Sequence, residues 1–300
     1  MPPLPPFRRL LRRQQWDTAT GVFALVAAVL LLPAAPSLAQ NALISHAEQP
    51  SRLIRKSIVH RAPAGVRLQV GDVVESSSTP VQLEWPNGAR LALGPVSSIL
   101  VGDAGGTPSV SLLRGWAKFA TTAPGGGQLA LDAGQLDLQA AGASGIVHLA
   151  ADKTELFVET GLVPATESGK GPVRVVKVGR EHYAVQPAVG NVTVALRAPR
   201  LFVESMPRAF LDPLVAVAAR TRAAMPTPQR PIAAADVAAW RDAGIPLRTR
   251  MAKQFSARLS DPAFRNDMED MLDDHPEWRD LLRRQRAAAG RANTPFNHLF

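Results

Sequence analysis

The chain contains no cysteine and a single tyrosine, and aromatic residues make up only 5% of its 300 positions. Without cysteine it cannot form a disulfide framework, a thiolate metal site or an iron–sulfur cluster, and it cannot use a cysteine nucleophile. Charged residues account for 20% of the sequence and hydrophobic residues for 46%. This balance is typical of a folded protein and not of a highly charged disordered chain. The length predicts one or two domains.

Positive charge is present in excess, but it is not concentrated. Residues 1–39 hold four arginines and one aspartate, so the formal charge of +9 becomes +6 for residues 40–300. Nucleic-acid-binding proteins gather basic and aromatic residues in one patch, whereas arginine is scattered here and aromatics are few. We therefore expect a solvated basic surface and no nucleic-acid partner.

The first 39 residues have the organisation of an export signal. The arginine cluster at 8–13 precedes an uninterrupted apolar run at 21–32, which Pro33 follows directly. Small residues then lead to Ala39, so the segment resembles a secretory signal peptide cleaved between Ala39 and Gln40. The alternative is an uncleaved inner-membrane anchor formed by residues 19–39. In either case residues 40–300 are expected in the periplasm, because the arginine cluster stays on the cytoplasmic side.

After a predicted linker at 40–51, short alternating apolar runs separated by turn residues extend over residues 52–205. No helical pattern of 10–15 residues lies between them, which argues against a parallel βαβ architecture. The fold class predicted is mainly β, as an antiparallel β-sandwich or a short β-solenoid-like module, followed by an α-helical C-terminal region. The expected strands are 66–70, 81–85, 90–93, 98–101, 110–113, 116–120, 129–132, 136–139, 146–149, 155–159, 173–178, 182–186 and 192–196.

One hairpin has a strong local signal. Asn87-Gly88 separates two alternating runs, and both residue types tolerate positive φ. We predict a tight turn with positive φ at both positions. The turn would place on one face the apolar side chains of Val81, Leu83, Trp85, Leu91 and Leu93.

The composition changes after residue 205, and residues 206–300 are predicted to be helical. A helical stripe at Leu211, Leu214, Val215 and Ala218 precedes a proline-rich linker at 225–231. Ser260-Asp261-Pro262 is typical of a helix start. Further stripes are formed by Leu247, Met251, Phe255, Leu259, Phe264, Met268, Met271, Trp278, Leu281 and Leu282.

Several segments of the β region together resemble a FecR-like domain. They are the Gly71-Asp72 turn, the Trp85-Pro86-Asn87-Gly88 hairpin, the Leu91-Ala92-Leu93-Gly94-Pro95 segment with Ser97 or Ser98, the Leu113-Arg114-Gly115 turn and the strand that ends at Gly161. The resemblance covers about residues 52–200. The structural motif residues that it implies are Gly71, Asp72, Trp85, Asn87, Gly88, Gly94, Gly115 and Gly161. Ala89 departs from the pattern, which has Ser or Thr at this position.

The helical tail resembles an extension found on some FecR-like envelope proteins of proteobacteria. Better-known relatives relay a signal to a cytoplasmic sigma regulator, for which they need a folded cytoplasmic segment. Only about twenty residues precede the apolar run here, which is too few for a domain. The resemblance therefore implies an exported β module that binds or scaffolds, and a membrane-anchored signal-relay role remains an alternative.

No catalytic motif stands out. The sequence lacks G-x-S-x-G, S-x-x-K and H-E-x-x-H, and its six histidines show no metal-ligand spacing. We expect no catalytic, cofactor-binding or metal-binding residue, and we expect His148 to be a half-buried strand residue. The leading hypothesis is a non-enzymatic protein that binds an envelope protein or glycan. The alternative is an enzyme acting on cell-wall or polysaccharide bonds with paired carboxylates such as Glu84 and Asp132.

Overall fold

The computed structural model describes residues 41–122, 127–167, 173–238, 240, 243–272 and 275–292. By their internal contacts these residues belong to one unit of the chain, residues 39–300. The predicted signal peptide, with its cleavage point between Ala39 and Gln40, lies outside the described residues. Within the described ranges, no helix is both long enough and apolar enough to cross a membrane.

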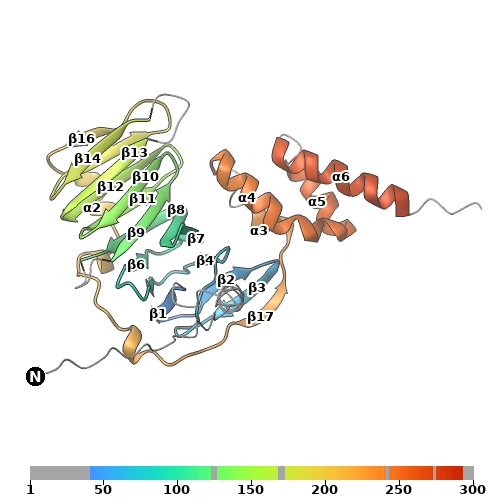
Figure 1. Cartoon of the computed structure of the whole chain (residues 1–300), viewed down its shortest axis with the longest axis horizontal. Coiled ribbons are helices and arrows are strands. Elements are labelled where there is room, and N and C mark those ends of the chain that lie inside the picture. The colour runs from blue at the N-terminus through green and yellow to red at the C-terminus, as the bar shows by residue number, and fades with distance from the viewer. Residues whose placement is uncertain are drawn as a thin grey trace, which may run out of the picture. The chain divides into compact units, whose positions relative to one another are not determined.

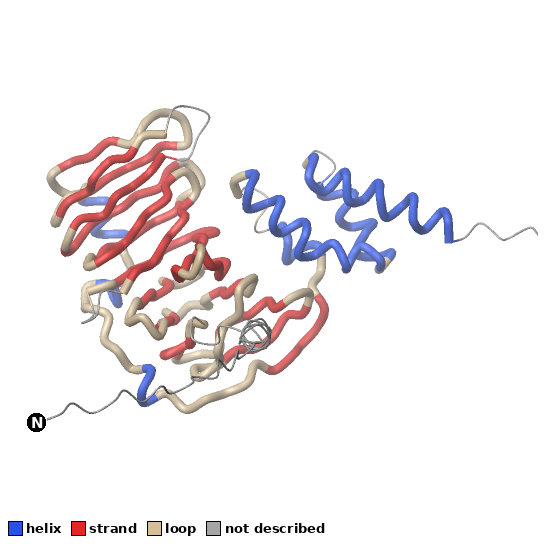
Figure 2. The backbone as a smooth tube through the Cα atoms, in the orientation of Figure 1, coloured by secondary structure: helices blue, strands red, loops and turns tan. Residues whose placement is uncertain are grey.

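The β region consists of two sheets, A and B, that share one long strand (Figures 1 and 2). Every neighbouring pair in sheet A is antiparallel. Its strands in spatial order are β1 (Leu43–Ala47), β5 (Val81–Glu84), β6 (Arg90–Leu93), the second part of β8 (Thr107–Ala120), β11 (Ser144–Leu149), β12 (Lys153–Thr160), β15 (Tyr183–Pro187) and β16 (Thr193–Ala195).

Sheet B is antiparallel except for the parallel pair β8–β9. Its strands in spatial order are β17 (Thr227–Pro231), β3 (Ile58–Ala62), β2 (Ser51–Arg55), β4 (Val73–Glu75), β7 (Ser98–Ala104), the first part of β8, β9 (Gln128–Ala133), β10 (Leu136–Ala141), β13 (Leu162–Glu167) and β14 (Val175–Gly179). The predicted mainly-β fold with C-terminal helices is therefore confirmed.

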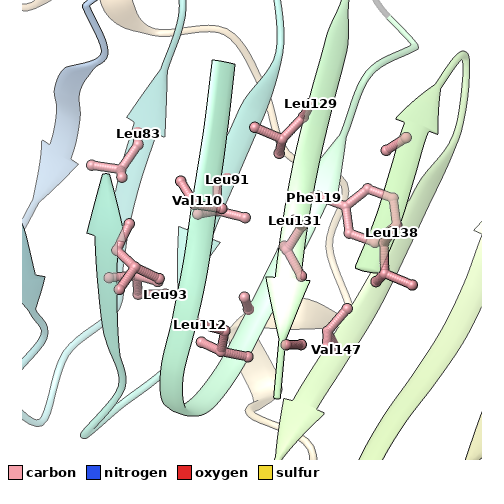
Figure 3. Packing of buried hydrophobic residues seen from close by; sticks show 14 of the residues in the cluster. Leu83, Leu91, Leu93, Val110, Leu112, Phe119, Leu129, Leu131, Leu138 and Val147 are labelled. Carbon is pink, nitrogen blue, oxygen red and sulfur yellow. The ribbon is translucent and has the colours of Figure 1, made fainter. Parts of the chain in front are cut away.

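Alternation along the strands builds the core. Successive side chains of a strand point to opposite faces, so every second residue can face the other sheet. Inward-facing residues of both sheets form one buried cluster, shown in Figure 3. Sheet A contributes residues such as Leu83, Leu91 and Phe119, and sheet B contributes residues such as Val110 and Leu131.

Two predicted linkers are strands in the structure. Residues 40–51 contain β1, which pairs with β5 and buries Ile44 completely. The proline-rich residues 225–231 contain β17, which pairs with β3 at the edge of sheet B. Prolines are tolerated there because an edge strand has one side without ladder hydrogen bonds. Both strands are short, and neither has a strong alternating pattern of its own.

The predicted hairpin has the expected register but a different turn. Val81 lies opposite Leu93 and Leu83 opposite Leu91, as predicted. The N–H of Gly88 donates to the carbonyl oxygen of Trp85 at 2.9 Å. Positive φ is found at Gly88 and not at Asn87, which corrects the two-residue turn.

The reason for this correction is the proline that precedes the Asn-Gly pair. Pro86 favours the second position of a type I turn, and a following glycine in the left-handed region then closes a three-residue loop. The Asn87 side chain supports the loop, because its Oδ1 accepts a hydrogen bond from the N–H of Ala89 at 3.0 Å.

The C-terminal helices bury most of the predicted stripes. Met251, Phe255, Leu259, Phe264 and Met268 are buried, as are Trp278 and Leu282. Asp261 caps the helix after it, since its Oδ1 accepts from the N–H of Ala263 at 3.0 Å. The helices are α3 (Ala234–Ala238), α4 (Ile245–Phe255), the 3-10 helix η5 (Ser256–Ser260), α5 (Pro262–Leu272) and α6 (Pro276–Ala292).

The helix predicted from Leu211 to Ala218 is absent. Leu211 and Val215 are mostly exposed, and the chain between the short 3-10 helices η3 (Arg208–Phe210) and η4 (Ala218–Arg220) is irregular. Pro213 lies inside the predicted stripe, where it removes a donor and clashes with the preceding turn. We call residues 196–226, which connect β16 to β17 and include the helix α2 (Arg200–Ser205), the strap.

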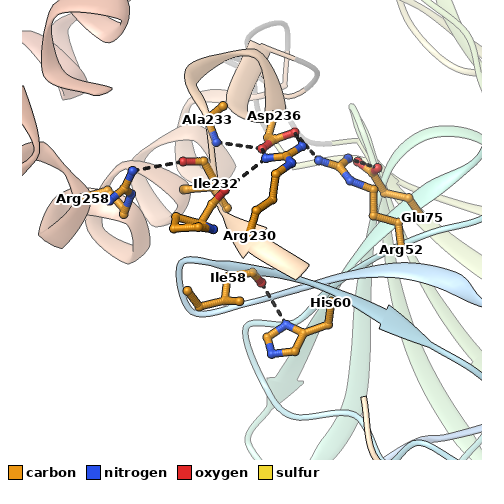
Figure 4. A network of polar contacts seen from close by, with 10 residues as sticks. Arg52, Ile58, His60, Glu75, Arg230, Ile232, Ala233, Asp236 and Arg258 are labelled. Carbon is orange, nitrogen blue, oxygen red and sulfur yellow. Dashed lines mark hydrogen bonds and ion pairs between the residues drawn. The ribbon is translucent and has the colours of Figure 1, made fainter. Parts of the chain in front are cut away.

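The helices and sheet B share buried residues. Ile54, Val73 and Leu100 of sheet B belong to the same apolar cluster as Trp240 and Phe255. An ionic network accompanies this contact (Figure 4): Arg52 of β2 pairs with Glu75 of β4 and with Asp236 of α3. Arg230 of β17 also binds Asp236, with an Nη1–Oδ2 distance of 2.6 Å.

Candidate functional site

The motif residues Gly94, Ser97 and Gly115 meet at one corner of the β region. Strand β8 pairs with β7 in sheet B up to Arg114 and with β11 in sheet A from Gly115 onward. Gly115 has φ +83°, and a Cβ atom at this position would overlap the side chain of Ser97. Only glycine fits such a close approach in this conformation. The corner thereby decides where Trp116, the next residue, enters sheet A.

Hydrogen bonds hold Trp116 at this corner. Its N–H donates to the hydroxyl oxygen of Ser97 at 2.8 Å, and its carbonyl oxygen accepts from the N–H of Gly94 at 2.9 Å. The Ser76 hydroxyl donates to the carbonyl oxygen of Gly94 at 2.5 Å. The segments around Gly94 and Gly115, which are 21 residues apart in the sequence, therefore form one framework.

The other motif residues also have structural positions. Asp72 is buried, accepts from the N–H of Gln69 at 2.7 Å and pairs with Arg55 at 2.6 Å. Gly71 precedes it in the turn, and Gly161 lies in the turn between β12 and β13. Trp85 is a core residue, and its neighbours Asn87 and Gly88 form the hairpin loop.

A row of aromatic and ionisable side chains crosses the outer face of sheet A, beginning at Trp116. His148 of β11 lies opposite Trp116 of β8, and Glu155 of β12 lies opposite His148. The rings of Trp116 and His148 are stacked, with centroids 3.9 Å apart and planes 9° from parallel. His148 Nδ1 lies 2.9 Å from Glu155 Oε2. Lys153 Nζ donates to Glu155 Oε1 at 2.9 Å. We call Trp116, His148, Lys153 and Glu155 the ligand row.

Glu155 is the hub of this row. The hydroxyl of Tyr183 donates to its Oε1 at 2.6 Å, in addition to the contacts with Lys153 and His148. Burial raises the pKa of Glu155, but the hydrogen bonds from Tyr183, Lys153 and His148 outweigh it and lower the pKa below its usual value. Burial and the bond to Glu155 raise the pKa of Tyr183. Glu155 is therefore an ionised anchor at neutral pH, and Tyr183 remains a neutral donor.

The row is only partly exposed. The side chain of His148 is 21% exposed and that of Lys153 is 33% exposed, whereas Glu155 is almost fully buried. Phe202 of the strap covers one side, with its ring centroid 5.2 Å from that of Trp116 and 5.4 Å from that of Tyr183. The outer face of sheet A therefore presents to solvent the edge of the stacked Trp116–His148 pair and the ammonium group of Lys153.

Two buried charges attach the strap to the same face. Lys118 Nζ donates to the carbonyl oxygens of Phe210 and Asp212 at 2.7 and 2.9 Å, and to Glu159 Oε1 at 2.7 Å. Glu84 Oε1 accepts from the N–H of Val217 at 2.8 Å and from that of the next residue at 3.1 Å. The cationic Lys118 thus binds carbonyl groups of the strap, and the anionic Glu84 binds its amide groups.

A shallow groove lies beside the strap on sheet A. It has a volume of about 190 Å³ and is lined by His46, Glu48, Pro80, Gln82, Ala92, Ala209, Phe210 and Leu214. Pockets for drug-sized ligands occupy about 300–1,000 Å³. The groove is therefore smaller than a pocket for a drug-sized ligand.

The carboxylates of the enzyme hypothesis occupy different sheets. Glu84 lies on β5 of sheet A and holds the strap. Asp132 lies on β9 of sheet B, opposite Asp137 of β10. Burial and the neighbouring Asp137 raise the pKa of Asp132 to about 6, although the Ser111 hydroxyl and Arg250 act against the shift. In the part of the chain that the structure describes, no group of three or more His, Asp or Glu could hold a metal ion.

Sequence reasoning missed most of the ligand row. It identified His148 only as a half-buried strand residue, which the structure confirms, and it did not single out Trp116, Lys153 or Glu155. The missing information was strand register, because the row joins three strands at matching positions. A usable signal was the two-residue spacing of Lys153 and Glu155 on one strand, which places both on the same face.

No family model and no curated protein matches the chain. Two crystal structures of a "putative anti-sigma factor" from Parabacteroides distasonis ATCC 8503 are similar to it, each with a TM-score of 0.36. Sequence identity is 15% for one and 16% for the other. The similarity covers 42% of this chain, and the chain spans 59% of the length of those structures.

Proposed function

We propose that the chain is a non-enzymatic, exported FecR-like protein of the periplasm that binds an envelope protein or glycan. The observation that carries the proposal is the ligand row on the outer face of sheet A. A stacked Trp116–His148 pair next to the ammonium of Lys153 offers an aromatic edge and a cationic donor. Aromatic side chains and a few convergent polar groups are what binding sites for small ligands contain.

The row suits recognition better than proton transfer. Glu155 accepts three hydrogen bonds, and its lowered pKa keeps it ionised, so it orients its neighbours. A general acid at neutral pH needs a raised pKa instead. The hypothesis of an enzyme that uses Glu84 and Asp132 is disfavoured by the structural role of Glu84. The alternative of a membrane-anchored signal-relay role requires that residues 19–39 remain uncleaved as an anchor.

The location and the resemblance support the proposal from the sequence. The organisation of residues 1–39 predicts export, and the motif residues of the FecR-like pattern form the corner that positions Trp116. Edman sequencing of the protein released by osmotic shock should begin at Gln40. Recovery of the full-length chain only in the membrane fraction would support the anchored alternative.

Binding is tested by using residues 40–300 as bait in envelope extracts and with purified peptidoglycan fragments. The parent should retain the same ligand repeatedly. Trp116→Phe and Lys153→Gln should each weaken retention about tenfold, because they remove the indole edge and the ammonium group. Trp85→Phe is the matched control, since this tryptophan lies in the core and not in the row.

The stability of each variant is measured in parallel by thermal unfolding. Unchanged retention in folded Trp116→Phe and Lys153→Gln would show that the row is not the binding site. Clean failure of the folded parent to retain any ligand would count against the binding function itself. Turnover of peptidoglycan that is lost in Glu84→Gln would favour the enzyme instead.

A further inference from the structure

The outward side of the strap carries apolar side chains that face solvent. Each of them is more than half exposed, although Phe202 and Phe210 of the same segment are buried. The residues are Leu196, Leu201, Val203, Leu211, Val215 and Met225. A folded monomer rarely leaves apolar side chains gathered in one segment unless that segment meets a partner.

Other residues of the strap make its contacts with sheet A. Phe202 and Phe210 are buried against the sheet. Lys118 binds the backbone carbonyls of 210 and 212, and Glu84 binds the amides of 217 and 218. The backbone is thereby held against the sheet, whereas the side chains of Leu201, next to Phe202, and Leu211, next to Phe210, remain exposed.

Basic residues alternate with the exposed apolar residues. The strap contains five arginines and two acidic residues, and one of these acids, Glu204, is paired with Arg200. Four other arginines are exposed, and among the described residues no ion pair joins them to an acid. They are Arg197, Arg208, Arg220 and Arg222.

We propose that the outward side of the strap docks on the surface of an anionic lipid bilayer. Arginines interspersed with exposed leucine and valine are the composition of segments that lie in the membrane interface, where the apolar groups enter the headgroup boundary and the guanidinium groups meet phosphates. The apolar side chains are spread along a segment that crosses the sheet, which fits a broad surface. The excess of positive charge on the strap favours a surface that carries negative charge. This inference is independent of the ligand row.

The test uses residues 40–300 and sedimentation with vesicles. All three buried clusters begin at residue 42 or later, so this chain keeps its complete core. It also lacks the apolar run 21–32, which by itself would partition into lipid. Binding should be strong to vesicles of phosphatidylglycerol and phosphatidylcholine, weak to phosphatidylcholine alone, and reduced by 0.5 M salt, as expected for about 1 kcal/mol per arginine near an anionic surface.

Two double variants locate the contact. Arg208→Gln with Arg222→Gln should lower the partition constant about 30-fold, since each arginine contributes about fivefold near an anionic surface. Leu201→Ser with Leu211→Ser should lower it about tenfold, because part of each side chain leaves the interface. Far-UV circular dichroism verifies that both variants remain folded.

Matched controls lie on the hairpin of sheet B that contains β14. Arg174→Gln with Lys177→Gln removes the same formal charge, although Arg174 is paired with Glu167 at 3.8 Å. Val173→Ser with Val175→Ser removes exposed apolar groups. Both controls should bind vesicles as the parent does. Equal losses in controls and strap variants, or binding to neutral vesicles as strong as to anionic ones, would overturn the proposal. Binding to polyglutamate but not to anionic vesicles would also overturn it and would identify an acidic protein as the partner.

Discussion

Lys118 is the residue whose removal most directly tests how the strap is held. Its side chain is 2% exposed and donates to the carbonyl oxygens of Phe210 and Asp212 and to the carboxylate of Glu159. Lys118→Met keeps the length and the apolar stem but leaves the carbonyl groups of Phe210 and Asp212 and the carboxylate of Glu159 without this donor. Hydrogen bonds to a charged group contribute about 1.5–3 kcal/mol each. The desolvation of the ammonium offsets part of this contribution.

Lys118→Met is expected to lower the free energy of unfolding by about 2–4 kcal/mol. This loss is smaller than that for breaking a fully buried ion pair, because Glu159 is 26% exposed. For a chain of this size that loss lowers Tm by roughly 5–12 °C. The matched control is Lys177→Met on β14, where the side chain is exposed and the expected change is within about 0.5 kcal/mol. Thermal and urea unfolding of residues 40–300 measure both.

Limited trypsin digestion gives a second readout that is specific to the strap. Arg208 and Arg220 lie on the strap and are exposed, but cleavage requires the local backbone to open. In Lys118→Met, cleavage after these arginines should accelerate at temperatures where the rest of the chain is still folded. A Tm within one degree of the parent, together with unchanged cleavage, would refute the argument that Lys118 anchors the strap.

Three further changes test the hairpin and two carboxylates by urea unfolding. Gly88→Val should cost roughly 1–3 kcal/mol, because φ is +86° there, and Gly88→Asn should cost less. Burial and Asp137 raise the pKa of Asp132 from 3.8 to about 6, so the folded state binds this proton more tightly. The parent should therefore lose stability relative to Asp132→Asn as the pH rises from 4 through 6, and the opposite slope would contradict the assignment. Burial raises the pKa of Asp236, but hydrogen bonds from Arg230 and from a backbone amide outweigh it and lower the pKa. Asp236→Asn should cost about 1–3 kcal/mol at pH 7, and the difference should disappear as the pH falls below the carboxyl pKa in the folded state.

Much of the fold could be predicted because local patterns and tertiary packing agree. Alternation placed Val81, Leu83 and Leu91 on the core face, and the structure buries all three. The stripe from Met251 to Phe255 and the proline start at 262 were readable for the same reason, since one face of each helix is buried. Where a segment follows one period and packs on one side, the sequence pattern is sufficient.

The failures occur where packing or a single proline overrides the pattern. Pro213 breaks an otherwise helical stripe, and the strap is then held by Lys118 and Glu84, which are distant in the sequence. Strands β1 and β17 form because neighbouring strands offer free edges, which no local pattern shows. Pro86 lengthens the hairpin loop from the predicted two residues to three. Each case depends on contacts or backbone sterics that residue periodicity does not include.

The ligand row could not be predicted for a related reason. The same reason limits which residues the FecR-like resemblance can predict. The residues that carry the resemblance, such as Gly94 and Gly115, fill close backbone approaches that accept few residue types. The row residues His148 and Lys153 are outward-facing positions, where many side chains are compatible with the same sheet. A pattern built from turns therefore identifies the framework that positions Trp116, and it leaves the chemistry of the outer face undetermined. The proposed binding function must therefore be tested on that face, through the Trp116 and Lys153 variants, and not inferred from the resemblance.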